Sequence, residues 1–255
     1  MEKLTKDELF SLAINLDLHD ILKLCSSNKK IDQRLCLRDN IWTHKLKEFP
    51  DYQQYLEDFK NMSKKEIYTL LYQLKILRQE LGSPYTIYEF YKFKELDLAM
   101  RKLAEIPKEI GNLINLEILR LGNNNIEKIP KELGDLINLK TIYLTGNKIR
   151  ELPKELGNLI NLKELYLGYN NIEKIPKEVG NLINLKKLDL TDNKIKELPK
   201  ELGKLINLRE LVLDDNPIRS VPKEISSIAY LNISPNDLKI QPESGIYNYL
   251  KSWLG

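Results

Sequence analysis

The sequence predicts an α/β solenoid, with a parallel concave sheet and an irregular or 3-10 convex side, preceded by an all-α N-terminal domain. Three observations lead to this fold. Prolines recur every 23 residues, a leucine pattern recurs with them, and no glycine occurs before Gly82. A fixed period of this length is typical of stacked structural repeats. The recurring prolines are Pro84, Pro107, Pro130, Pro153, Pro176, Pro199 and Pro222.

The leucine pattern shows how one repeat folds. The unit Leu116 to Asn138 reads LEILRLGNNNIEKIPKELGDLIN, and its successors begin at Leu139, Leu162, Leu185 and Leu208. Alternation in Leu119-Arg120-Leu121 predicts a short strand with the leucines inward and the arginine outward. One repeat cannot bury its own apolar side chains, so the stack is the folding unit.

A column of asparagines follows the predicted strands. An asparagine side chain both donates and accepts hydrogen bonds, so it can pair with backbone groups that the turning chain leaves free. Stacking the repeats turns these bonds into a ladder. Its members are Asn124, Asn147, Asn170, Asn193 and Asn216, while Arg101 occupies the equivalent position of the first unit.

The repeated unit, LxxLxLxxNxIxxIPxxLGxLxN, closely resembles the leucine-rich repeats of the intracellular, Ras-suppressor-like class. The likeness covers about 170 residues. It implies a solenoid that binds another protein on its concave face. The extent of the repeat pattern predicts domain limits of 83–242 for the solenoid, after a helical domain and cap at 1–82. The amphipathic spacing after Gly245 predicts a C-terminal capping helix at 243–255.

The first eighty residues favour helices. Thr5 to Glu8 reads as a capping box before a first helix, and Ser63 to Glu66 reads as a second one before a helix that runs to Leu81. Shorter helices are expected at Asp20 to Cys25, Asn28 to Arg38 and Asn40 to Glu48, with Trp42 and Leu46 facing inward.

Residues 4–50 resemble an F-box, and they are most similar to the F-box-like segments that large DNA viruses fuse to repeat arrays. The matching residues are Leu4, Glu8-Leu9, Leu12, Leu16, Asp20-Ile21-Leu22, Leu24, Asn28-Lys29-Lys30 and Asn40-Ile41-Trp42. The resemblance implies docking on a Skp-type adaptor through an exposed apolar surface formed by Leu4, Leu9, Leu12, Leu16, Ile21 and Leu22. Family members carry a Leu-Pro pair near the start of the segment, which contributes to adaptor docking, and this sequence has Leu4-Thr5 in its place. The alternative is that these helices only cap the solenoid.

The candidate partner-binding residues lie where the repeats differ. Three tyrosines are expected to adjoin in the middle of the concave face, between an Ile-Arg pair and an acidic flank. Tyrosine and arginine are over-represented in binding hot spots, although tyrosine is also a good β-residue. The candidates are Ile118, Arg120, Tyr143, Tyr166, Tyr169, Asp189, Asp192, Val212 and Asp214.

Composition argues against several other functions. The net charge of +3 is a small difference between 40 basic and 37 acidic residues mixed along the chain, which disfavours nucleic-acid binding. No apolar run is long enough for a membrane span, and the N-terminus lacks a signal-peptide core. His19 and His44 are isolated, so neither a metal site nor a cofactor is expected.

Cysteine usage and the repeats together predict a non-enzymatic, cytoplasmic monomer, which could act in a host cell's cytoplasm or nucleus. Cys25 and Cys36 are read as reduced core thiols, because a disulfide framework would staple the repeats. The repeats predict protein–protein interaction, and the F-box resemblance implies the role of substrate-recognition subunit in an SCF-type ubiquitin ligase. The alternative is a stand-alone repeat scaffold or inhibitor.

Overall fold

The computed structural model describes residues 6–27, 36, 39–50, 52–225 and 230–232. The chain forms two compact units, Met1–Ile87 and Tyr88–Gly255. The sequence suggested a boundary at residue 82. The first unit extends further because the segment after the last long helix is held to that helix. There, the Arg78 guanidinium donates to the Tyr85 carbonyl (2.9 Å), and the Ser83 N–H donates to the Arg78 carbonyl (2.9 Å).

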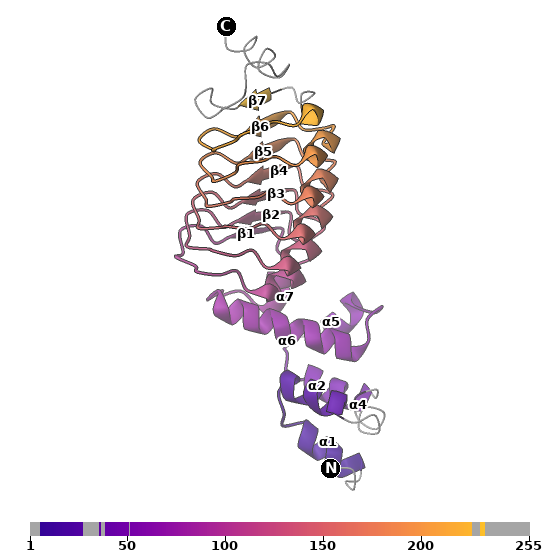
Figure 1. Ribbon diagram of the computed structural model, residues 1–255. Helices are drawn as coiled ribbons and strands as arrows, with labels where there is room; N and C mark the ends of the chain where they lie inside the picture. The colour runs from indigo at the N-terminus through magenta and orange to yellow at the C-terminus, as the bar shows by residue number, and fades with distance from the viewer. Residues whose placement is uncertain (1–5, 28–35, 37–38, 51, 226–229, 233–255) are drawn as a thin grey trace. The chain divides into compact units, whose positions relative to one another are not determined.

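The first unit is helical, as the sequence predicted. Its helices are α1 (Lys6–Ala13), α2 (Leu18–Ser27), α4 (Asp39–Leu46), α5 (Tyr52–Asp58) and α6 (Lys64–Glu80), and α7 (Ile87–Tyr91) follows (Figure 1). The capping box at Ser63 is confirmed, with both of its reciprocal bonds to Glu66 present. The predicted box at Thr5 and most of the predicted helix 28–38 lie outside the described residues.

The core of this unit is aromatic. Trp42 and Leu46 are buried as predicted, and α4 packs against α6. The ring of Tyr68 on α6 lies 5.8 Å from the Trp42 ring and 5.8 Å from the Phe49 ring. The Trp42 indole N–H donates to the Cys36 carbonyl at 2.8 Å, so its one polar group is satisfied.

The two cysteines are joined in a disulfide, and the expectation of two reduced thiols is therefore wrong. Cys25 near the end of α2 and Cys36 are 11 residues apart, with their Cα atoms 6.0 Å apart, which suits a disulfide. Sequence spacing alone could not show that these two buried residues meet. Disulfides persist mainly in oxidising compartments. Cysteine usage therefore no longer supports an intracellular location.

The second unit is a solenoid with a 7-stranded parallel sheet in sequential order. From β1 to β6, each strand pairs with the next at a shift of one repeat, so equivalent residues lie side by side. The central residue of each strand from β1 to β6 points into the core. The strands are β1 (Glu95–Asp97), β2 (Ile118–Arg120), β3 (Thr141–Tyr143), β4 (Glu164–Tyr166), β5 (Lys187–Asp189), β6 (Glu210–Val212) and β7 (Tyr230–Asn232).

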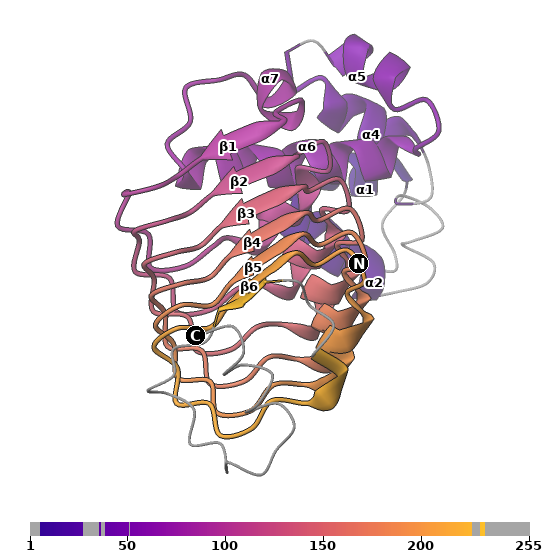
Figure 2. The ribbon, with the colours of Figure 1, turned by 90° about the horizontal axis from the view of Figure 1, so that it is seen from above.

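Short 3-10 turns form a column on the side opposite the sheet (Figure 2). They are η2 (Lys108–Asn112), η3 (Lys131–Asp135), η4 (Lys154–Asn158), η5 (Lys177–Asn181), η6 (Lys200–Lys204) and η7 (Lys223–Ile225). Proline precedes each turn, and its fixed φ sets the entry angle. The glycine in each turn from η2 to η6 allows a close approach between repeats. A Cβ on Gly111, for example, would lie 2.7 Å from the Glu132 carbonyl oxygen.

The predicted asparagine ladder is confirmed. Asn170 is buried, and its amide nitrogen donates to the carbonyls of Leu167 in its own repeat and Leu144 in the previous one, both at 3.0 Å. Its side-chain oxygen accepts from the Ile149 N–H at 3.0 Å. The other four members make equivalent bonds. No buried side-chain N or O atom in the described part of the chain lacks a hydrogen-bond partner.

A second asparagine ladder, not expected from the sequence, runs beside the 3-10 turns. The side chain of each member donates to a backbone carbonyl in the preceding repeat, at distances between 2.7 and 3.0 Å. The signal was present as the invariant asparagine that ends each repeat. The members are Asn115, Asn138, Asn161, Asn184 and Asn207.

The ends of the array depart from the repeat. Where Arg101 replaces the ladder asparagine, Asn124 serves both units, accepting from the N–H groups of Arg101 and Leu103 at 3.0 Å each. The last strand, expected from Leu231, is β7 at Tyr230–Asn232. The expected capping helix at 243–255 lies outside the described residues.

Candidate binding surface

The concave face consists of the outward side chains of strands β1 to β6. Strand register places them in two columns, which confirms the arrangement that the repeat alignment predicted. The first column contains Glu95, Ile118, Thr141, Glu164, Lys187 and Glu210. The second contains Asp97, Arg120, Tyr143, Tyr166, Asp189 and Val212.

An aromatic row crosses the middle of this face. The rings of Tyr143 and Tyr166 stack, with centroids 4.7 Å apart and planes 5° from parallel. The Arg120 guanidinium carbon lies 4.7 Å from the Tyr143 ring centroid, and the Lys187 ammonium lies 5.6 Å from the Tyr166 centroid. The two rings are therefore enclosed between two cations, an arrangement that the ring quadrupoles favour.

Each of these cations is itself held by a glutamate. The Arg120 Nε lies 2.8 Å from a Glu95 carboxylate oxygen, and the Lys187 Nζ lies 2.7 Å from a Glu210 carboxylate oxygen. The aromatic row therefore consists of Glu95, Arg120, Tyr143, Tyr166, Lys187 and Glu210, one residue from each strand from β1 to β6. The stacking and the paired cations fix the orientation of the two tyrosine rings in the absence of a partner.

Hydrogen bonding, charge and burial raise the pKa values of two residues at this face, Arg120 and Tyr166. The hydrogen bond from Arg120 to Glu95 raises the pKa of the guanidinium. Partial burial, with Glu164 adding a second contribution, raises the pKa of Tyr166 to about 12. The Tyr166 hydroxyl donates to a Glu164 oxygen at 3.2 Å. This phenol therefore stays neutral, with its oxygen free to accept a further hydrogen bond.

A third column follows the strands and adopts the left-handed backbone conformation. Its φ values lie between 49° and 72°, and it contains Met100, Asn123, Gly146, Tyr169, Asp192 and Asp215. Glycine, asparagine and aspartate tolerate this conformation well, whereas larger side chains do so at a cost of about 1–2 kcal/mol. This conformation was not among the expectations from the sequence. The Gly, Asn and Asp residues of the column were the signal that could have revealed it.

Tyr169 and Met100 are the two large, exposed side chains of the left-handed column, and Tyr169 is its aromatic member. It is an aromatic residue with φ 56°, and its side chain is 59% exposed. Burial therefore does not explain why a tyrosine is placed in a strained conformation. Gly146 holds the same position one repeat earlier and presents no side chain beside it. Strain at an exposed residue is typical of a functional surface.

The predicted acidic flank is present beside the aromatic row. Asp192 and Asp215 are exposed, and Asp189 and Asp214 are half-buried. The Asp189 carboxylate accepts from the backbone N–H and the hydroxyl of Thr191, at 3.0 and 2.7 Å, so its direction is fixed. Because Arg120 and Lys187 are already paired, the concave face offers unbalanced negative charge. Ile118 and Val212, the two apolar candidates, are half-buried.

The predicted adaptor-binding residues do not form one exposed surface. Leu9 and Ile21 are buried in the helical unit, which contradicts the expectation that they face outward. The burial of Leu9 follows from helical spacing, because Leu9 shares its face of α1 with the fully buried Ala13. Leu12 is 44% exposed, while Leu16 and Leu22 are half-buried. Leu4 lies outside the described residues.

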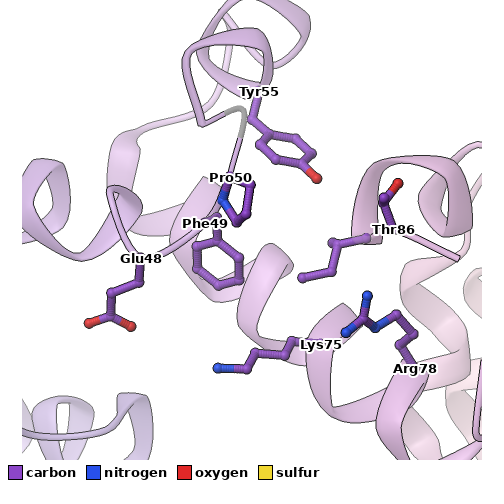
Figure 3. A pocket seen from close by; sticks show the side chains of 8 residues that line it. Glu48, Phe49, Pro50, Tyr55, Lys75, Arg78 and Thr86 are labelled. Carbon is purple, nitrogen blue, oxygen red and sulfur yellow. The ribbon is translucent and has the colours of Figure 1, made fainter. Parts of the chain in front are cut away.

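A small pocket of about 210 Å³ lies in the helical unit. Figure 3 shows the rings of Phe49, Pro50 and Tyr55 together with the cationic side chains of Lys75 and Arg78. Its volume is below the roughly 300–1,000 Å³ of most ligand sites. Within the described residues, no cluster of three or more His, Cys, Asp or Glu is arranged to hold a metal ion. The described helices include none long and apolar enough to cross a membrane.

Comparison with known proteins identifies the family. The family described as leucine-rich repeat region matches residues 58–169 and 153–234, so the chain belongs to the leucine-rich-repeat proteins. A search of curated proteins found no match. Leucine-rich-repeat solenoids are interaction modules, which use their extended concave surfaces for binding.

Two solved structures illustrate the likeness. A leucine-rich-repeat protein of Leptospira interrogans is 32% identical with a TM-score of 0.53, over 69% of this chain and 50% of that one. The plant peptide hormone receptor RGFR1, in complex with RGF2, is 34% identical with a TM-score of 0.54, over 58% of this chain and 25% of that one. The chain thus spans half the length of the first protein and a quarter of the second.

The strain at Tyr169 is testable by exchange with its equivalent, Asn123. We expect Tyr169→Asn to raise the free energy of unfolding by about 1 kcal/mol, because asparagine tolerates the left-handed conformation. The reciprocal Asn123→Tyr should lower it by a similar amount. Denaturant unfolding of both variants measures the effect. A marked loss of stability in Tyr169→Asn would show instead that the ring contributes packing.

Proposed function

We propose that this protein binds another protein on its concave face, through the aromatic row and Tyr169. The observation that carries the proposal is Tyr169 itself, an exposed aromatic residue in a strained backbone conformation, three residues after the stacked Tyr166. Structural need does not explain it. Aromatic side chains that are fixed before binding, as the stacked rings of Tyr143 and Tyr166 are, lose little entropy when a partner binds.

The chemistry of the face specifies the partner. The flat sides of Tyr143 and Tyr166 are covered by each other and by two cations, so their edges and hydroxyls remain for contact. Tyr169 supplies an exposed ring. The neighbouring aspartates Asp189, Asp192 and Asp214 favour positive charge. A matching segment would carry an apolar anchor next to lysine or arginine. The complex of the plant receptor with RGF2 supports ligand binding by this architecture.

Selection of peptides from a random displayed library against the full chain tests this proposal. We expect the selected peptides to combine basic residues with an apolar anchor. The double substitution Tyr143→Ala/Tyr166→Ala should weaken their binding at least about thirtyfold, as loss of a hot spot does. The half-buried, stacked rings also predict a stability loss of about 1 kcal/mol, so affinities are compared at a temperature where both proteins are folded.

The control is Lys154→Ala, an exposed residue of η4 on the opposite side of the repeat. Its affinity for the selected peptides should equal that of the parent chain. Selected peptides that bind the double tyrosine variant with full affinity would contradict the proposal, as would a selection that yields only acidic peptides.

A second candidate function is substrate recognition for an SCF-type ubiquitin ligase, with the N-terminal helices docked on a Skp-type adaptor. The observation that favours it is the exposure of Leu12 on α1, an apolar residue with no burial to explain it. Docking of this kind requires a cytoplasmic or nuclear location, where thiols are kept reduced. The Cys25–Cys36 disulfide weighs in the other direction and favours helices that only cap the solenoid.

Adaptor docking is tested by pull-down of the full chain with a purified Skp adaptor. Leu12→Glu should abolish binding while the fold survives, because the side chain is exposed. Ser11→Glu, also exposed on α1, is the matched control and should bind normally. Leu9→Glu is unsuitable, since it would bury an unpaired charge. Failure of the parent chain to bind, or unchanged binding by Leu12→Glu, rules the docking out.

A further inference from the structure

An exposed apolar ridge runs along the solenoid between the 3-10 turns and the strands. Every complete repeat contributes one isoleucine to it, and these side chains are between 44% and 84% exposed. The isoleucine ridge consists of Ile114, Ile137, Ile160, Ile183 and Ile206. Contiguous exposed apolar side chains on a soluble protein mark interaction surfaces more often than isolated ones do.

The backbone holds the ridge rigidly. The N–H of Ile160 donates to the Asn158 carbonyl at 2.8 Å, and its carbonyl accepts from the Asn184 side chain at 2.8 Å. Ile183 makes the equivalent bonds to Asn181 and Asn207, at 2.8 and 2.7 Å. The second asparagine ladder therefore fixes the spacing of the ridge. Isoleucine is also stiff at χ1, so these side chains are ordered in advance.

The turn itself does not require isoleucine. Its hydrogen bonds come from the backbone and from the asparagines, and the isoleucine side chain points away from the core. A polar residue would satisfy the same turn and expose less apolar area to water. The apolar character of all five positions therefore calls for a partner that covers them.

A basic column flanks the ridge. The residue three positions after each isoleucine from Ile137 onward is cationic and exposed, and consecutive members are joined by backbone hydrogen bonds of 2.7 to 2.8 Å. Lys140 pairs with Glu117. Its successors have no ion-pair partner among the described residues, which leaves their charge available. The basic column consists of Lys140, Lys163, Lys186 and Arg209.

We propose that the isoleucine ridge and the basic column form a docking surface for an acidic amphipathic α-helix. Neighbouring repeats are spaced by roughly 4.8 Å, the separation of paired strands. Three or four residues of an α-helix advance about 4.5–6 Å, so a helix can set one apolar side chain against each isoleucine. Glutamates or aspartates along one flank of the helix then meet the basic column.

Other occupants fit the surface less well. One face of a β-strand repeats only every two residues, roughly 6.6 Å, and would fall out of step with the ridge. A membrane is flat and wide, whereas the ridge is one side chain wide and bordered by asparagine amides already bonded to backbone carbonyls. If two copies of this chain met through the ridge with their basic columns on the same side, positive charge would face positive charge.

The test uses a synthetic helical peptide with leucine at every third or fourth position and glutamate along one flank. We expect the full chain to bind it saturably in a fluorescence anisotropy titration. The double substitution Ile160→Thr/Ile183→Thr should weaken binding at least about tenfold with an unchanged melting temperature, because these side chains are exposed. Lys163→Glu/Lys186→Glu should weaken it comparably.

Two controls isolate the ridge. Ile160→Val/Ile183→Val keeps the apolar branch and should bind nearly as the parent does. Tyr143→Ala/Tyr166→Ala alters only the concave face and should leave peptide affinity unchanged, so the outcome here is independent of the proposed concave function. Failure of the parent to bind, equal binding by the threonine variant, or equal binding of a scrambled peptide overturns the proposal.

Two further measurements test the other occupants. Sedimentation of the parent chain that reveals a dimer, dissolved by the threonine substitutions, would assign the ridge to a second copy and overturn the helix proposal. Binding to phosphatidylserine vesicles that the same substitutions abolish, without binding of the peptide, would assign the ridge to a membrane and overturn it as well.

Discussion

The buried asparagine ladder sets the register on which the whole solenoid depends. Each ladder residue bonds to its own repeat and to the one before it, as Asn170 does with Leu167 and Leu144. The groups that it satisfies are buried backbone N–H and carbonyl groups, and each would cost about 1–3 kcal/mol if left unpaired. An amide is required because it donates and accepts at once. Since every repeat is locked to the next in the same way, equivalent residues must fall into straight columns.

That register divides the surface by charge. Along the strands, aspartates and glutamates outnumber the two cations, and both of these, Arg120 and Lys187, are already paired. At the turn before the strands, the basic column presents lysines and an arginine next to exposed isoleucines. The net charge of the chain is only +3, yet its surface has an acidic concave face and a separate basic flank. Opposed surfaces of this kind allow one small solenoid to contact two partners of different chemistry.

The period of the prolines and leucines was enough to predict the strands, their inward residues and the ladder, because each depends on spacing within a repeat. The columns of the concave face followed from the same spacing. What could not be predicted depends on conformation or on contacts between distant residues. The stacking of Tyr143 on Tyr166 is of this kind, and so is the Cys25–Cys36 disulfide. The left-handed backbone of the third column did leave a signal in its Gly, Asn and Asp residues, whereas Tyr169 carries no such signal. Leu9 was misplaced because a degenerate apolar pattern does not say which face of a helix is buried.

Amide hydrogen exchange at the ladder tests the central claim most directly. The N–H groups of Ile149 and Ile172 lie outside the strands, and each donates to a ladder asparagine of the next repeat at 3.0 and 2.9 Å. If the ladder holds the register, these two amides should exchange as slowly as the strand amides of Leu165 and Leu188, opening only when the array unfolds. Exchange at the rate of exposed loop amides would show that the strands, and not the asparagines, hold the repeats in register.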